Sequence, residues 1–442
     1  MRTRARVRGG RRSAALRTAA PVVTMLLAAV ACGAPASQVR PGSSSRSATT
    51  SHGAETADVG RSVPGRGTAT DTTSAAVGAP PVAAGVIPSI AAASCPDRIF
   101  SGMTTAQRVG QLFMGGISAA RPDQAQLRVL RDNHVGSVML TGRSSAGVKA
   151  TRSVVDGLRR QADQVAGRRV GILVATDQEG GHVQVLSGPG FAAIPEALTQ
   201  GSWSTATLRT RAAQWAGQLK AAGVDLDLAP VADVVPAGLG TRNGPIGRYF
   251  REYGHTPDTV APHSDAFAAG FAQAGVMTTL KHFPGLGQVI GNTDTTANVV
   301  DSVTTASSAS LTPFRTGIKA GSPFVMISLA KYTKIDSAHL AAFSPTVIGR
   351  LLRTQLGFKG VVISDDLGQA VAVRSYTPAQ RALNFLTAGG NMILTVQPST
   401  IPAMTQAVLT RMQQDASFRA QVNDSVHRIL AAKLRAGLLA CP

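Results

Sequence analysis

The sequence is poor in cysteine, in aromatic residues and in acidic side chains. It has three cysteines, 4% aromatic residues and 24 acidic residues against 44 Lys and Arg in 442 positions. Cys and His do not occur in paired metal-ligand spacings, so we expect no metal site and no cofactor. The basic excess is spread along the chain and is not interleaved with aromatics. This argues against a nucleic-acid partner and favours an anionic polymer of the cell envelope.

The first 17 residues lack acidic side chains and contain seven Arg. An apolar run at 19–31 follows, too short to span a bilayer as a mature helix, so residues 1–31 are predicted to be an export signal. The small residues before Cys32 resemble a bacterial lipobox, although Ala29 stands where that motif usually has Leu. We therefore expect lipid attachment at Cys32, with plain secretion as the alternative. The pair Arg11 and Arg12 also permits twin-arginine export.

Residues 32–94 have almost no aromatic side chains and consist mainly of Ser, Thr, Ala, Gly and Pro. Such a segment buries too little apolar surface to offset the entropy of ordering, so it is predicted to be a disordered tether. We expect the tether to be followed by a globular domain at 95–442, which we expect to be a monomer. Through the lipid on Cys32, the tether would attach this domain to the outer face of the cytoplasmic membrane.

Two of the three cysteines, Cys95 and Cys441, bracket the globular part. An exported chain matures in an oxidising compartment, so we predict that they form a disulfide. Two free surface thiols are the alternative.

Short apolar runs alternate with amphipathic stretches throughout the globular part. Alternating strands and helices indicate parallel strand pairing, and eight such units in about 350 residues favour an α/β fold with a single (β/α)8 TIM-type barrel. Helix starts are predicted at Thr312, Ser344 and Thr377, each an N-cap residue before a Pro. The eight predicted strands are 111–117, 135–140, 171–176, 224–229, 276–280, 324–328, 360–363 and 391–396.

Polar side chains follow several of these strands, where a barrel of this type carries its chemistry. The seventh run ends in Asp365 and Asp366. Either Asp365 is a catalytic carboxylate, or one of the two caps the next helix while the other is solvated. Carboxylates together with a Lys and a His suit sugar chemistry better than a metal site. The strand-end residues are Asp177, Gln178, Glu179, Asp227, Asp233, Lys281, His282, Asp365 and Asp366.

Three stretches resemble the bacterial β-N-acetylglucosaminidases of glycoside hydrolase family 3, including its lipoprotein branch. They are Ala175–Gly181 (ATDQEGG), Lys281–Gly285 (KHFPG) and Ser364–Leu367 (SDDL), in the order and approximate spacing of that family. The resemblance covers residues 100–437 and implies a (β/α)8 barrel that removes terminal β-linked N-acetylglucosamine from cell-wall glycans with retention of configuration.

The resemblance also implies roles for individual residues. The Asp that ends the seventh strand, Asp365, would attack the anomeric carbon. Asp177, Lys281 and His282 would bind sugar hydroxyls through charge-assisted hydrogen bonds. A further Arg of the family corresponds to Arg251 rather than to Arg248, because the residues that follow Arg251 fit the family pattern better.

One part of the family pattern is missing. Its general acid/base is a His oriented by an Asp; here the Asp is Asp294, but Thr296 stands in place of the His. A hydroxyl of very high pKa cannot protonate a leaving oxygen near neutral pH. Asp294 itself could serve as the acid if apolar surroundings raise its pKa. Otherwise the enzyme is slow or limited to activated substrates, or the barrel is a glycan-binding protein without turnover.

Overall fold

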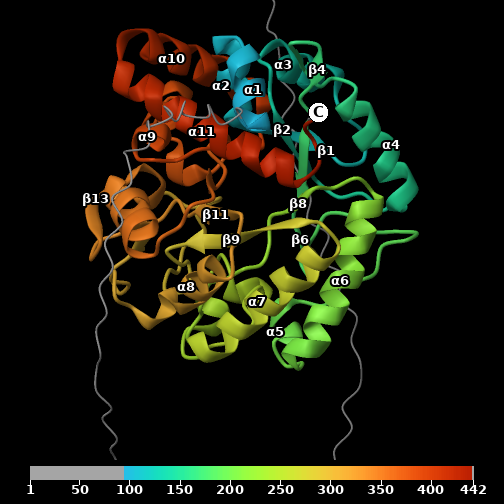
Figure 1. The fold of residues 1–442 in the computed structure, drawn as a ribbon. Coiled ribbons are helices and arrows are strands. Elements are labelled where there is room, and N and C mark those ends of the chain that lie inside the picture. The colour runs from blue at the N-terminus through green and yellow to red at the C-terminus, as the bar shows by residue number, and fades with distance from the viewer. Residues whose placement is uncertain (1–93, 441–442) are drawn as a thin grey trace, which may run out of the picture. The chain divides into compact units, whose positions relative to one another are not determined.

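The computed structural model describes residues 94–440, whose helices and strands alternate along the chain (Figure 1). The predicted export signal at 1–31, the predicted lipidation site at Cys32 and most of the predicted tether lie outside the described residues. Within residues 94–440 no helix is long and apolar enough to cross a membrane.

Eight parallel strands form the barrel that the sequence predicts. Each strand pairs with its neighbours in chain order, and a bridge between Ile363 and Met392 joins the last strand but one to the last. All eight predicted strands are confirmed, with ends shifted by a few residues. The strands are β1 (Phe113–Ser118), β2 (Ser137–Thr141), β5 (Leu173–Thr176), β8 (Leu226–Asp227), β9 (Met277–Phe283), β11 (Phe324–Ile327), β14 (Val361–Ser364) and β15 (Ile393–Thr395).

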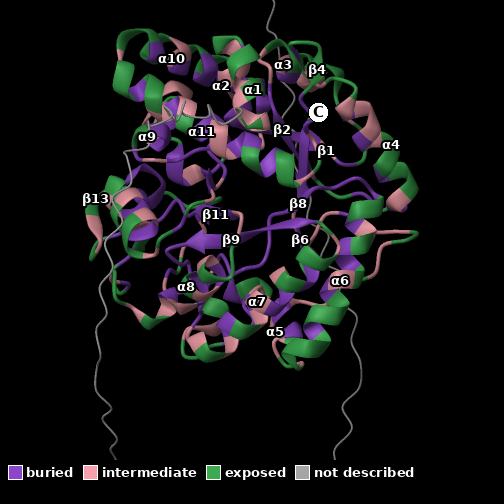
Figure 2. Ribbon diagram, viewed as in Figure 1, coloured by how far each residue is buried: buried purple, intermediate pink, exposed green. Residues whose placement is uncertain are grey.

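The barrel strands are buried on both faces, as their continuous apolar runs require. Every residue of β14 is buried, and so is every residue of β9, which includes Lys281 and His282 at its carboxyl end. Figure 2 shows the buried residues gathered on the strands and on the inner sides of the surrounding helices. The two ionisable side chains of β9 are thus held in the interior and need partners there.

Helices surround the barrel. Two of the three predicted helix starts are confirmed: Thr377 forms a capping box with Gln380, and the Ser344 hydroxyl accepts a hydrogen bond from the N–H of Val347. The third start is one residue off: a helix does begin at Thr312, but Thr312 is its first residue and not its N-cap, and no side chain caps it. The helices are α1 (Cys95–Gly102), α2 (Thr105–Gln111), α3 (Gln124–Asp132), α4 (Gly147–Arg159), α5 (Ala197–Gln200), α6 (Thr205–Ala221), α7 (Pro257–Gln273), α8 (Thr312–Lys319), the π-helix η5 (Thr346–Gln355), α9 (Pro378–Thr387), α10 (Ile401–Gln414) and α11 (Ala416–Arg435).

Shorter elements lie mainly in the loops between strands and helices. Two of these loops, which carry β6 and η6, shape the cavity described below. The short strands are β3 (Gln164–Val165), β4 (Arg168–Arg169), β6 (Gln178–Gly180), β7 (Val183–Gln184), β10 (Val300–Asp301), β12 (Lys331–Tyr332) and β13 (Asp336–Leu340). The 3₁₀ turns are η1 (Gly240–Arg242), η2 (Gly247–Tyr249), η3 (Ala309–Leu311), η4 (Ala341–Phe343), η6 (Val371–Val373) and η7 (Pro398–Thr400).

The two ends of the domain meet. Helix α1 contacts α11, and Leu439 forms an antiparallel bridge with Val170. Cys95, the first residue of α1, is disulfide-bonded. Cys441, its predicted partner, lies outside the described residues, so the pairing stays a prediction that the proximity of the chain ends supports.

We predict that Cys95→Ser lowers the free energy of unfolding by about 3 kcal/mol, because the disulfide restricts the unfolded chain. Urea unfolding of both proteins measures the difference. A reductant should destabilise the wild type and leave Cys95→Ser unchanged. Peptide mapping of the unreduced exported protein should yield a peptide that joins Cys95 to Cys441, and equal stability of wild type and variant would contradict the prediction.

Candidate active site

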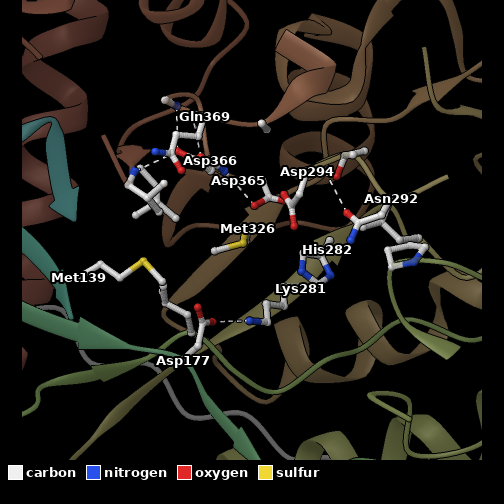
Figure 3. Close-up of a pocket in the computed structure, with 18 of the residues that line it drawn as sticks. Met139, Asp177, Lys281, His282, Asn292, Asp294, Met326, Asp365, Asp366 and Gln369 are labelled. Atoms are coloured by element: carbon white, nitrogen blue, oxygen red, sulfur yellow. Dashed lines mark hydrogen bonds and ion pairs between the residues drawn. The ribbon is translucent and has the colours of Figure 1, made fainter. Parts of the chain in front are cut away.

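A cavity of about 800 Å³ opens at the carboxyl ends of the barrel strands. All six predicted catalytic and sugar-binding residues line it, although they are spread over nearly 190 positions of the sequence. Figure 3 shows Asp177 and Lys281 at one end of the cavity, Gln369 at the other, and Asp365 and Asp294 between them. The six residues are Asp177, Arg251, Lys281, His282, Asp294 and Asp365.

The two adjacent aspartates after β14 have different partners. The N–H of Asp365 bonds to the carbonyl of Ile327, which continues the pairing of β14 with β11 and directs the side chain into the cavity. Asp366 instead accepts hydrogen bonds from three backbone N–H groups, those of Gly368, Gln369 and Val396. The next helical turn of the described chain, η6, begins only at Val371, so Asp366 does not cap a helix; it fixes the turn after β14 and joins it to the loop after β15. Asp365 keeps a half-buried carboxylate that faces the cavity.

Four charged side chains form a buried network at one end of the cavity. Lys281 Nζ lies 2.6 Å from Asp177 and 2.6 Å from Glu179. Glu179 also accepts two hydrogen bonds from Arg251, of 2.8 and 2.7 Å. Arg251 rather than Arg248 is thus the arginine of the site, since Arg248 is exposed and does not line the cavity.

Glu179 stands at the centre of this network. Its side chain is 4% exposed, and although burial opposes ionisation, Arg251 and Lys281 lower its pKa to about 2. Gly180 follows with a φ of +108°, and a Cβ there would lie 2.3 Å from the carbonyl oxygen of Pro195. The residue after Glu179 must therefore be Gly for the chain to turn. Sequence reasoning gave Glu179 no role, although it stands inside the Asp-Gln-Glu-Gly-Gly run.

His282 is oriented by a carboxylate behind it. Its Nδ1 lies 2.7 Å from Asp233, which is fully buried and also accepts the N–H groups of His282 and Leu286. The Asp233 carboxylate accepts, so His282 donates from Nδ1, and its other ring nitrogen, Nε2, is left for the cavity. The sequence alone assigns no role to Asp233 either. Its position just after the fourth predicted strand is the signal that could have placed it at the site.

Asp294 reaches the cavity from the loop after β9, and Thr296 does not line it. The backbone of this loop is fixed to the segment after β14: the N–H of Val371 bonds to the carbonyl of Asp294, and the N–H of Ala372 to that of Thr293. The position where the family carries its His is therefore exposed and turned away from the cavity. The ionisable group that this loop contributes to the cavity is the carboxyl of Asp294.

The pKa of Asp294 is raised to about 6. The walls of the cavity desolvate its carboxyl, and the negative charge of Asp365 adds to the effect, while Arg251 and His282 oppose it. The residue as a whole remains exposed, so water still reaches it. Asp294 is thus a carboxylic acid that retains its proton up to about pH 6, beside a second carboxylate.

The described residues contain no group of three or more His, Cys, Asp or Glu side chains that could hold a metal ion. The chemistry open to the cavity is that of carboxyl groups with fixed cations nearby. One carboxyl group can attack a sugar carbon and a second can transfer a proton, and these are the two functions that a glycosidase needs.

Comparisons with known proteins agree with this site. Residues 104–432 match the profile of the glycosyl hydrolase family 3 N terminal domain. The chain is 32% identical over 315 residues to a beta-hexosaminidase of Xanthomonas axonopodis pv. citri, covering 70% of this chain and 90% of that protein.

Solved structures give the same result. A beta-N-acetylhexosaminidase from Beutenbergia cavernae is 49% identical, with a TM-score of 0.73, over 75% of this chain and 98% of that one. A family 3 beta-N-acetylglucosaminidase from Paenibacillus is 28% identical, with a TM-score of 0.67, over 76% of this chain and 63% of that one.

We predict that Glu179→Gln removes about 3 kcal/mol of stability at pH 7, because a pKa of about 2 instead of 4.5 in the folded state stabilises the ionised form. The lowered pKa means that this stability is present above pH 4.5 and is lost as pH falls towards 2. Urea unfolding at pH 7 and pH 3 measures it: wild type and variant should differ less at pH 3. The exposed pair Arg152–Asp156 supplies the control, since Asp156→Asn should change stability by less than about 0.5 kcal/mol. Equal losses for Glu179→Gln and Asp156→Asn would contradict the prediction.

Proposed function

Because the chain belongs to the family 3 glycoside hydrolases, we propose that it removes terminal β-linked N-acetylglucosamine, or a related N-acetylhexosamine, from cell-wall glycans. The observation that carries the proposal is the carboxyl pair of Asp365 and Asp294 beside a fixed sugar-binding network. The beta-hexosaminidase names of its relatives support the same substrate class.

In the proposed retaining mechanism Asp365 attacks the anomeric carbon and Asp294 protonates the departing oxygen. The new bond joins Asp365 Oδ to the sugar carbon while the glycosidic C–O bond breaks, and the proton of Asp294 passes to the leaving group. Water then attacks the glycosyl-enzyme, Asp294 takes up a proton from this water, and Asp365 is released as a carboxylate.

The interaction between the two carboxyl groups supports both halves of this cycle. In the free enzyme the charge of Asp365 helps to raise the pKa of Asp294, so that Asp294 holds a proton to donate. Once Asp365 is bonded to the sugar it carries no charge, and its effect on Asp294 disappears. Asp294 then ionises more readily and can act as the base for the second step.

The network at the other end of the cavity would hold the sugar. Asp177 can accept two hydroxyl hydrogens, and Lys281 and Arg251 can donate to hydroxyl oxygens, each through charge-assisted hydrogen bonds. His282, oriented by Asp233, adds its second ring nitrogen, Nε2. Glu179 would position Arg251 and Lys281 without touching the sugar.

We also propose that the protein acts as a monomer on the outer face of the cytoplasmic membrane, attached by a lipid on Cys32. The basic, apolar and small-residue segments at 1–31 support export, and the small residues before Cys32 support lipidation. The segment at 33–93 would then separate the domain from the membrane.

We predict that Asp365→Asn abolishes turnover of p-nitrophenyl β-N-acetylglucosaminide, because an amide of the same shape cannot attack carbon. Asp294→Asn should lower kcat/KM about 10²-fold or more on the unactivated β-1,4-linked disaccharide of N-acetylglucosamine and less on the nitrophenyl substrate, whose leaving group needs little protonation. Wild-type kcat/KM on the disaccharide should fall as pH rises above about 6, where Asp294 loses its proton.

Asp294→Asn should lose this decline above pH 6, and Asp424→Asn, on the exposed face of α11, serves as the control. A wild type that binds N-acetylglucosamine but shows no turnover above the Asp365→Asn background would favour the glycan-binding alternative. An unchanged pH profile in Asp294→Asn would assign the acid to another group.

Replacing Cys32 by Ser should release the protein from membranes into the soluble fraction, because it removes the site of lipid attachment. Fractionation of cells that express each form, followed by immunoblotting, measures the distribution. Ser43→Ala, within the same segment, is the matched control. Membrane association that persists unchanged in Cys32→Ser would contradict lipid anchoring.

A further inference from the structure

The cations that line the cavity differ in their partners. Lys281 and Arg251 are held by carboxylates. Arg381 donates to the carbonyls of Tyr376, Leu367 and Gly368. Arg374 is exposed, and within residues 94–440 its guanidinium has no hydrogen-bond or ion-pair partner. It is therefore the lining cation that remains available to a ligand.

Two neutral side chains that line the cavity also have polar groups available to a ligand. Gln369, on the same loop as Arg374, and Gln397, on the loop after β15, are both exposed. Their backbone N–H groups form hydrogen bonds, but in the described part of the chain their side-chain amides form none. This side of the cavity thus offers hydrogen-bond donors and one positive charge.

The loops that carry these three side chains are fixed in place. Asp366 accepts N–H groups from Gln369 on one loop and from Val396 on the other, which joins the loop after β14 to the loop after β15. Arg381 bonds to carbonyls on both sides of η6, the turn that precedes Arg374. The donors therefore stand on a rim whose backbone is preorganised, so that mainly side-chain entropy is lost on binding.

The rim lies on the leaving-group side of the reaction. In Figure 3 Gln369 is at the end of the cavity opposite Asp177 and Lys281, with Asp365 and Asp294 between. The loop of Asp294 bonds directly to Val371 and Ala372, the residues just before Arg374. If the terminal sugar occupies the Asp177 end, the group beyond its anomeric carbon extends towards this rim.

We propose that Arg374, with Gln369 and Gln397, forms a leaving-group subsite that selects an acidic substituent, a carboxylate or a phosphate, on the unit attached to N-acetylglucosamine. The inference rests on the proposed function. Arginine suits such a group because its planar guanidinium offers two parallel N–H donors to two oxygens. The opposite end of the cavity has no such free cation among the described residues, since Lys281 and Arg251 are already neutralised.

The test compares N-acetylglucosaminides with matched leaving groups. One carries a hexosamine with an O-lactyl carboxylate, the second its methyl ester, the third a polyol phosphate and the fourth the free polyol. Wild type should prefer each acidic substrate to its neutral partner in kcat/KM. In Arg374→Ala this preference should fall about tenfold, the effect of one charge-assisted hydrogen bond at an exposed position. The substrate pair, carboxylate and ester or phosphate and free polyol, whose acidic preference falls more in Arg374→Ala identifies the natural acid as carboxylate or phosphate.

Arg315→Ala, which removes an exposed charge from α8 outside the cavity, is the control and should leave both rate and preference unchanged. Arg374→Lys should recover part of the preference, because it restores the charge without the planar donors. A preference that is equal in wild type and Arg374→Ala would overturn the proposal.

Hydrolysis of the nitrophenyl substrate by wild type tests the proposed function separately from the subsite. Wild type that hydrolyses this substrate but shows no preference for acidic leaving groups would contradict only the subsite. If wild type does not turn over any substrate, dissociation constants of Asp365→Asn for the acidic compounds and their neutral partners decide the question. An acidic preference that Arg374→Ala removes would support the subsite even then. No preference in binding would overturn it.

Discussion

The ion pairs of Glu179 are the interaction on which the active site depends. Two cations and two carboxylates are removed from water at the end of the barrel, and their desolvation is offset only because each finds a charged partner at hydrogen-bond distance. Glu179 connects residues from two separate parts of the chain, Arg251 and Lys281, and so fixes their relative positions before any substrate arrives. Electrostatic preorganisation of this kind avoids reorganisation during the reaction.

Much of the barrel could be predicted from the sequence because its signals are local. Runs such as Val361–Ile363 are apolar without interruption, as strands buried on both faces must be. The short strand β8 (Leu226–Asp227) is also predicted, although Asp225 and Asp227 interrupt the apolar run at 224–229. For α8 only the cap is wrong: Thr312 before Pro313 resembles an N-cap residue, and only the three-dimensional structure shows that η3 leads directly into the helix.

The site could be predicted in part. The residues that end strands, such as Asp365 and Lys281, follow from fold and family pattern. Glu179 and Asp233 were given no role because their function lies in partners far away in the sequence, 72 and 49 positions distant. For Asp294 the sequence left its role open, because a raised pKa depends on surroundings that no spacing in the chain reveals. Arg374 stands out only once the partners of every other lining cation are known.

The loop that carries Asp294 is attached to the barrel by backbone hydrogen bonds to Val371 and Ala372, and not by side-chain contacts of the acid itself. Replacement of the Asp294 side chain therefore leaves the buried ion pairs and the barrel strands untouched. Asp365, the proposed nucleophile, has no such freedom, because it continues a central strand. Under the proposed mechanism, a family built in this way can over evolutionary time exchange one proton donor for another, imidazole for carboxyl, and so shift its working pH, while the attacking group and the fold stay the same.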